Sequence, residues 1–81
     1  MKLNEFVKEF EEILTVKPGT ITLETNLNDI DEWDSLTKIA LDVFLEDEFK
    51  IKVEQKEIEN FETFADIVDI VKDQLENDDE V

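Results

Sequence analysis

The strongest constraint on the fold is the near absence of residues that break helices. The 81-residue chain has one proline and one glycine, which stand side by side at Pro18 and Gly19. A fold with many tight turns needs more of both, so the sequence favours helices over a turn-rich β-fold. A chain of this length forms one small domain. Its core is modest, because a small domain buries only about 60 % of the surface that the unfolded chain exposes.

Apolar residues recur at helical spacing from Leu3 to Leu14, which predicts an amphipathic helix. The helix should end before Lys17, because the residue before a proline is biased away from helical geometry. The connection from Thr20 to Trp33 has too many apolar residues for a solvated linker. We expect it to lie across the helices and to close one side of the core. Its apolar anchors are Ile21, Leu23, Leu27, Ile30 and Trp33.

A second helix is predicted to begin at Asp34 or Ser35 and to end near Glu48. At about 100° per residue, its apolar side chains fall on two opposite faces. One face holds Leu41, Phe44 and Leu45, with Phe49 close by, and the other holds Leu36, Ile39 and Val43. Such a helix is either sandwiched in a core or shows one side to a partner. Few elements remain to cover both faces, so we expect the second face to stay partly exposed, although the loop could cover it.

The last part of the chain predicts two more helices. The segment EQKEIENF can form one or two turns, and Thr63 is a favoured N-cap with Asp66 three residues later, as in a capping box. The fold class is therefore all-α: a small bundle of three main helices plus one short helix, with a long ordered loop between helices one and two. Residues 1–76 are expected to form a single domain, and residues 77–81 a frayed acidic tail.

The composition argues against several classes of function. A net charge of −16 repels nucleic-acid phosphates and anionic membranes. It favours protein partners with basic patches and indicates a monomer. Without cysteine or histidine the chain lacks thiol chemistry, the usual base of serine hydrolases and the commonest zinc ligand. No apolar run approaches the roughly 20 residues of a membrane span. The N-terminus does not resemble a signal peptide, so we expect a soluble cytoplasmic protein.

Three aspartates before the second helix raise the question of calcium. Asp29, Asp31 and Asp34 lie near one another in the sequence. The EF-hand pattern fails, because no glycine occupies the sharp-turn position and Trp33 stands where an oxygen ligand belongs. We therefore expect no metal site.

The only serine, Ser35, allows three interpretations. It could cap the second helix, but Asp34 is equally favoured there and could do so alone. It could be a nucleophile, but only lysine or a carboxylate could act as its base, and nothing resembles the G-x-S-x-G elbow. It could be a site of attachment, because a phosphate on it would lie near free N–H groups at the positive end of the helix dipole. The apolar face of Leu36, Ile39 and Val43 would then meet the modifying enzyme.

At these residues the sequence resembles the acyl carrier proteins and the related peptidyl carriers. The resemblance covers about residues 3–75, with DSL at the start of a helix, TNLNDIDEWDSL leading into it, LEDEF at its end and ETFADIVDIV at the last helix. It implies that Ser35 carries 4′-phosphopantetheine through a phosphodiester, installed from coenzyme A by a phosphopantetheinyl transferase. Asp34 and Leu36 match the family motif beside the attachment site.

The resemblance also implies how the chain works. The terminal thiol of the arm would hold an acyl or aminoacyl group as a thioester and present it to loading and transferring enzymes. The chain itself would have no catalytic activity. In the family, an acidic and apolar surface of the second helix docks onto basic patches of partner enzymes. Here that surface would consist of Leu36, Ile39, Val43, Glu46 and Asp47.

The sequence departs from the fatty-acid carriers at several positions. Trp33 precedes DSL, where those carriers usually have a small residue, and Thr37 and Ala40 replace frequent acids. Asp42 stands where an apolar residue is usual, and we expect it to pair with Lys38 one turn earlier. EWDSL looks more like stand-alone carriers of specialised pathways, such as surface-glycan modification or secondary metabolism.

A second hypothesis comes from another class of function. The chain could be a non-enzymatic acidic interaction module, such as a nucleic-acid mimic that binds a basic protein surface. The net charge of −16 fits both hypotheses. The mimic gives no reason for an exposed serine beside an apolar patch, whereas the carrier explains both features.

Overall fold

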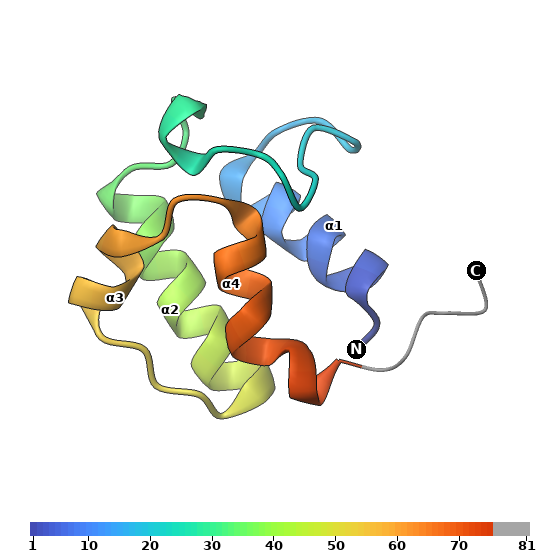
Figure 1. The fold of residues 1–81 in the computed structure, drawn as a ribbon, viewed down its shortest axis with the longest axis vertical. Coiled ribbons are helices and arrows are strands. Elements are labelled where there is room, and N and C mark those ends of the chain that lie inside the picture. Colours follow the sequence, from blue (N-terminus) through green and yellow to red (C-terminus); the bar gives the residue numbers. More distant parts are fainter. Residues whose placement is uncertain (76–81) are drawn as a thin grey trace.

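The computed structural model describes residues 1–75, so the acidic tail predicted at residues 77–81 lies outside the described residues. Within them, helices surround one apolar core, and no strand is present (Figure 1). The α-helices are α1 (Leu3–Leu14), α2 (Ser35–Phe49), α3 (Gln55–Asn60) and α4 (Phe64–Val71), and two 3-10 helices are η1 (Leu27–Asp29) and η2 (Lys72–Gln74). The predicted all-α fold, with three longer helices and a short one, is confirmed.

Helix α1 buries one stripe of large side chains. Phe6, Phe10 and Leu14 follow one another every fourth residue and are at most 1 % exposed, because this spacing keeps them on one face of a helix. The helix ends at Thr15, which adopts a left-handed conformation with φ 62° and closes the last turn through its N–H. Gly19 then has φ 90°, a conformation that glycine adopts without strain. The predicted end before Lys17 is confirmed.

The long loop between α1 and α2 crosses one end of the helices, as Figure 1 shows. Ile21, Leu27 and Trp33 are buried, so these predicted anchors are confirmed. Leu23 is different, because its side chain is 43 % exposed. It anchors the loop through its backbone, since its carbonyl accepts the N–H of Ala65 at 3.1 Å.

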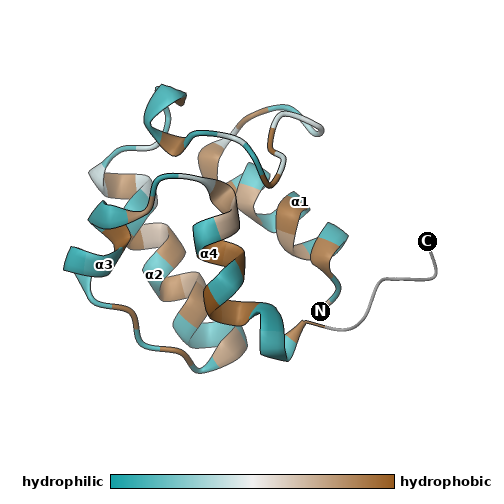
Figure 2. Ribbon diagram, viewed as in Figure 1, coloured by the Kyte–Doolittle hydropathy of each residue, from teal (hydrophilic) through white to brown (hydrophobic). Residues whose placement is uncertain are grey.

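Aromatic rings at the centre of the core join α1 to α4. The ring centroids of Phe10 and Phe64 are 4.8 Å apart, and those of Phe6 and Phe64 are 5.7 Å apart. Full burial of one such side chain contributes about 1.5–3 kcal/mol. Apolar and hydrophilic segments alternate along both helices (Figure 2), and the contacts above place the apolar sides against each other. These core contacts therefore stabilise the bundle, and they do not involve the outer face of α2.

Helices α2 and α4 begin as the sequence predicts. Helix α2 starts at Ser35, after the N-cap Asp34, and Leu41, Leu45 and Phe49 are buried on its inner face. Helix α4 starts after Thr63, and the Asp66 carboxylate accepts the N–H groups of Thr63 (3.2 Å) and Glu62 (2.8 Å). No helix in the described part of the chain is both long enough and apolar enough to span a membrane.

Candidate functional site

Helix α2 begins with a reciprocal cap between Asp34 and Thr37. The N–H of Thr37 donates to Asp34 Oδ1 at 3.1 Å, and the N–H of Asp34 donates to Thr37 Oγ1 at 2.9 Å. The Thr37 hydroxyl in turn donates to the carbonyl oxygen of Glu32 at 2.7 Å. These bonds satisfy backbone groups that a helix start leaves without partners. They fix the last residues of the loop against the first turn of the helix.

This hydrogen bonding lowers the pKa of the Asp34 carboxyl. The largest cause is the N–H of Thr37, which stabilises the carboxylate. Loss of hydration opposes the effect, and the Thr37 hydroxyl and the N–H of Leu36 add smaller lowering contributions. The carboxylate therefore stays charged at neutral pH and adds a negative charge directly before the helix.

Ser35 is the first residue of α2, and it is exposed. Asp34 provides the cap, so the capping interpretation of Ser35 is excluded. Within residues 1–75, the Ser35 hydroxyl has neither a hydrogen-bond partner nor a side chain placed as a base. A hydroxyl activated as a nucleophile needs such a base. The geometry offers a free hydroxyl at the positive end of a helix.

The outer face of α2 extends from Ser35 as an apolar strip. Leu36 is 77 % exposed, Ile39 50 % and Val43 55 %. Spacings of three and four residues place them on one side of the helix, and this confirms the prediction that the second face is partly exposed. Glu46 and Asp47 are exposed at the far end of the same helix, so the structure brings the predicted partner-binding residues onto one surface. We call Leu36, Ile39 and Val43 the α2 strip.

The predicted ion pair between Lys38 and Asp42 is wrong. The Lys38 ammonium lies 5.7 Å from the centroid of the Trp33 ring. Oδ1 of Asp42 is buried and has no hydrogen-bond partner among the described residues. An ammonium that paired with this oxygen would have to leave water, whereas the ring face attracts a cation that stays partly hydrated. Trp33 itself is 8 % exposed, and its ring packs edge-on against that of Phe10, with the two ring centroids 5.8 Å apart.

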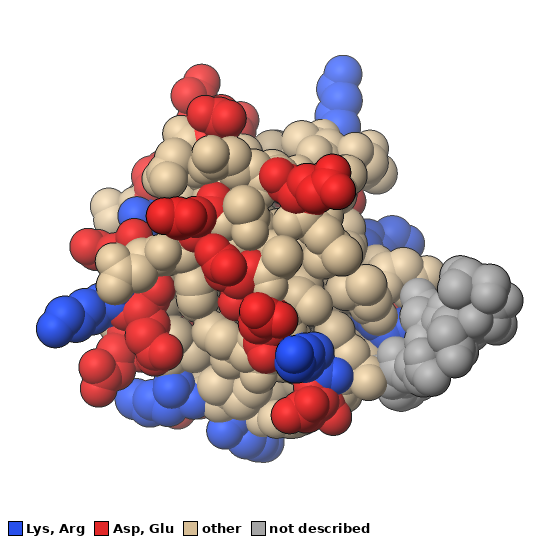
Figure 3. Space-filling model, viewed as in Figure 1, with Lys and Arg blue, Asp and Glu red and all other residues tan. Residues whose placement is uncertain are grey.

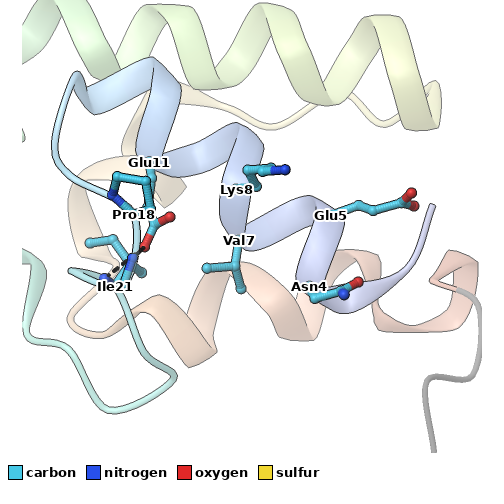
Figure 4. Close-up of a pocket in the computed structure, with 8 residues that line it drawn as sticks. Asn4, Glu5, Val7, Lys8, Glu11, Pro18 and Ile21 are labelled. Carbon is cyan, nitrogen blue, oxygen red and sulfur yellow. Dashed lines mark hydrogen bonds between the residues drawn. The ribbon is translucent and has the colours of Figure 1, made fainter. Parts of the chain in front are cut away.

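Sequence reasoning missed two polar residues that shape the site and its loop. Thr37 completes the cap, and the D-x-x-T pattern at a helix start was a signal for it. Glu11 is 4 % exposed, and its Oε2 accepts the N–H groups of Gly19 (2.9 Å) and Ile21 (3.0 Å). Figure 4 shows this carboxylate directed at the loop. No signal in the sequence separated Glu11 from the solvated acids of α1.

A cleft of about 270 Å³ lies between α1 and the loop after it. Asn4, Val7, Lys8, Glu11 and Pro18 are among its lining residues, and none of the lining residues belongs to α2 (Figure 4). Among residues 1–75, no three or more histidine, cysteine, aspartate or glutamate side chains come together as a group that could hold an ion, and Asp29, Asp31 and Asp34 are included in this.

Comparisons with known proteins agree on one family. The chain is 32 % identical over 80 residues to an acyl carrier protein of Petrotoga mobilis, and the match covers 98 % of this chain and 94 % of that protein. The search of family models gave no match.

Two solved structures share the fold. The solution NMR structure of the holo acyl carrier protein from Geobacter metallireducens has a TM-score of 0.70 and 33 % identity, over 89 % of this chain and 83 % of that one. A Mycobacterium tuberculosis protein assigned as an acyl carrier protein has a TM-score of 0.71 and 30 % identity, over 89 % and 97 % of the two chains. These similarities, together with the helix order and the long loop before α2, show that the chain belongs to the acyl carrier protein family.

Proposed function

We propose that Ser35 is the attachment point of 4′-phosphopantetheine and that the chain carries acyl or aminoacyl groups on this arm. One observation carries the proposal: the only serine has an exposed hydroxyl, without a hydrogen-bond partner among residues 1–75, at the first position of a helix that a neighbouring residue already caps. The similarity to a holo acyl carrier protein supports the presence of a prosthetic group.

The residues around Ser35 fit a phosphodiester. The first turn of a helix has backbone N–H groups without intrahelical partners, and the helix dipole favours negative charge there. Ser35 is accessible, because both it and the neighbouring Leu36 are exposed. When bound, the arm supplies the thiol that this cysteine-free chain lacks, and the thiol holds the cargo as a thioester. The chain's own residues hold the arm, and partner enzymes carry out the chemistry.

Attachment exchanges the phosphoanhydride bond of coenzyme A for a phosphate ester bond to Ser35. The Ser35 oxygen would bond to the phosphorus next to pantetheine in coenzyme A, and the bond from that phosphorus to the bridging pyrophosphate oxygen would break. Adenosine 3′,5′-bisphosphate leaves, and the hydroxyl proton is lost. Ser35 has no base of its own within hydrogen-bond distance among residues 1–75, so the transferase must accept this proton. In this proposal the chain is a substrate of the transferase and has no activity of its own.

The α2 strip is the proposed docking surface for the transferase and for the loading and transferring enzymes. Leu36, Ile39 and Val43 expose apolar area beside Ser35, and Glu46 and Asp47 border it. Acidic side chains are spread across the face seen in Figure 3. A net charge of −16 steers the chain toward basic surfaces, and apolar contact at the strip then holds the complex.

An intact-mass measurement tests the attachment. The protein is incubated with coenzyme A and a broad-specificity phosphopantetheinyl transferase, alongside Ser35→Ala. We expect the wild type to gain one phosphopantetheinyl group and Ser35→Ala to gain none. No gain on a folded wild type, with a transferase shown to be active on another carrier, would overturn the proposal. It would favour the acidic interaction module.

The docking surface has a separate test. Ile39→Ala should lower the transferase kcat/KM about tenfold, because truncating a central interface residue costs more than about 1 kcal/mol. Leu23→Ala is the matched control, since Leu23 is 43 % exposed but lies on the loop. Equal effects of the two substitutions on kcat/KM would exclude the α2 strip as the docking surface.

A further inference from the structure

The start of α2 contains a single cation in strongly acidic surroundings. Lys38 is the only basic residue between Lys17 and Lys50. Asp34 and Asp42 lie one turn before and one turn after it, yet no carboxylate oxygen comes within 4.0 Å of its ammonium among the described residues. Asp34 instead binds the N–H of Thr37, and Oδ1 of Asp42 is buried. Among residues 1–75, the ammonium therefore has no anionic partner in the unmodified protein.

The Lys38 ammonium lies over the ring of Trp33. The distance from Nζ to the ring centroid is 5.7 Å, and Trp33 stands directly before the N-cap Asp34 in the sequence. Long side chains on a helix point toward its N-terminus. The ring is a fixed platform, because it is 8 % exposed and packs against Phe10.

Ser35 lies on the same side of the helix as Lys38. The two residues are three positions apart, a spacing that leaves about 5–6 Å between their Cβ atoms. A phosphodiester on Ser35 would add a negative charge next to the ionised Asp34. A full negative charge attracts an ammonium more strongly than a ring face does.

We propose that Lys38 is a positioning residue for the phosphodiester of the arm. Its ammonium rests on Trp33 while Ser35 is unmodified and moves to the phosphodiester when Ser35 is modified. This inference rests on the proposed function and extends it, because it assigns the charge compensation at the attachment site to one residue. It also makes Trp33 a reporter of the modification state.

Tryptophan fluorescence tests the exchange directly, because the chain has one tryptophan and no tyrosine. The emission of Trp33 is recorded before and after loading for the wild type, Lys38→Gln and Lys56→Gln. Lys56 is exposed on α3, so Lys56→Gln makes the same change of net charge away from the site. Intact mass establishes complete loading of each sample.

We expect the wild type and Lys56→Gln to shift their emission on loading. Before loading, the Trp33 emission of Lys38→Gln should differ from that of both other proteins, and loading should not shift it. The ³¹P chemical shift of loaded Lys38→Gln should likewise differ from that of the loaded wild type, whereas that of loaded Lys56→Gln should equal it. Full loading without an emission shift in the wild type, or with an equal shift in Lys38→Gln, would overturn this inference alone. Failure of the wild type to load would instead overturn the proposed function.

Discussion

The starts of α2 and α4 use the same two residue types in opposite order. Helix α2 has Asp34 at the N-cap and Thr37 three residues on, whereas α4 has Thr63 at the N-cap and Asp66 three residues on. Backbone N–H groups lower the pKa of both carboxyls: that of Thr37 is the largest cause for Asp34, and that of Glu62 for Asp66. Both helix starts therefore combine a threonine with an aspartate whose carboxylate accepts backbone N–H groups, within the helix for Asp34 and before it for Asp66.

The two helix starts differ in the residues directly after the cap. The first residue of α4 is Phe64, which is fully buried, and its N–H donates to the carbonyl of Thr25 at 3.1 Å. The first residues of α2 are Ser35, which is exposed, and Leu36, which is 77 % exposed. One helix start is closed by the loop and the core, and the other is exposed to solvent. Capping alone therefore does not distinguish the two helix starts, whereas the exposure of the first turn does.

The largest expected difference between the two starts is in stability. Phe64→Ala should lower the free energy of unfolding by about 3–5 kcal/mol, because it leaves a cavity in the core. Leu36→Ala should change it by less than about 0.5 kcal/mol, as is usual for surface substitutions. Urea unfolding of both variants measures the difference. A cost for Leu36→Ala close to that for Phe64→Ala would mean that the α2 strip is part of the core.

A smaller effect is expected at the cap of α2. Thr37→Val keeps the shape of the side chain but removes the hydroxyl that joins Asp34 to Glu32. We expect a loss of about 1 kcal/mol in the free energy of unfolding, the net value of a typical hydrogen bond. Thr37→Ser is the matched control, since it retains the hydroxyl and should stay near the wild type. If Thr37→Val and Thr37→Ser unfold at the same urea concentration, the hydroxyl does not hold the start of α2.

The two caps should also share a dependence on pH. A carboxyl with a lowered pKa in the folded state contributes stability that is fully present above its unfolded pKa of about 4. The contribution is lost as the pH falls through the folded pKa. We expect Asp34→Asn and Asp66→Asn each to flatten the acid side of the stability profile, because the asparagine Oδ1 can still accept the backbone N–H groups but does not titrate. Thermal unfolding from pH 7 to pH 2 measures this, and profiles parallel to the wild type would contradict it.

The smallest expected effect is that of salt. The net charge of −16 disfavours the compact state through self-repulsion, and salt screens it over about 10 Å at 0.1 M. The melting temperature should rise modestly with sodium chloride. A melting temperature that fell with salt would show that attractive ion pairs outweigh the repulsion.

The spacing of apolar residues predicted most of the fold, because it determines which face of each helix is buried. The stripe of Phe6, Phe10 and Leu14 and the exposed side of α2 are both found where the sequence placed them. The exposed hydroxyl of Ser35 was also predictable, since Asp34 beside it is a sufficient cap.

Other features depend on which of several possible partners a side chain binds, and the sequence alone does not determine this. Lys38 is within reach of Asp34, Asp42 and Trp33, and the partner it finds depends on burial and on prior hydrogen bonds. Glu11 is found among several acids on α1, and only the path of the loop makes it the one that binds backbone N–H groups. Leu23 is predicted as an anchor from its apolar side chain but acts through its carbonyl.

We propose that the open start of α2, and no other helix start, accepts the arm. Peptide mapping by mass spectrometry after treatment with coenzyme A and the transferase tests it most directly. The wild type is compared with a double variant, Ser35→Ala with Thr63→Ser, which moves the serine to the start of α4. We predict one phosphopantetheinyl group on the wild-type peptide that contains Ser35, and none on the double variant. Modification of a different peptide in the wild type, or of the relocated serine, would contradict the claim.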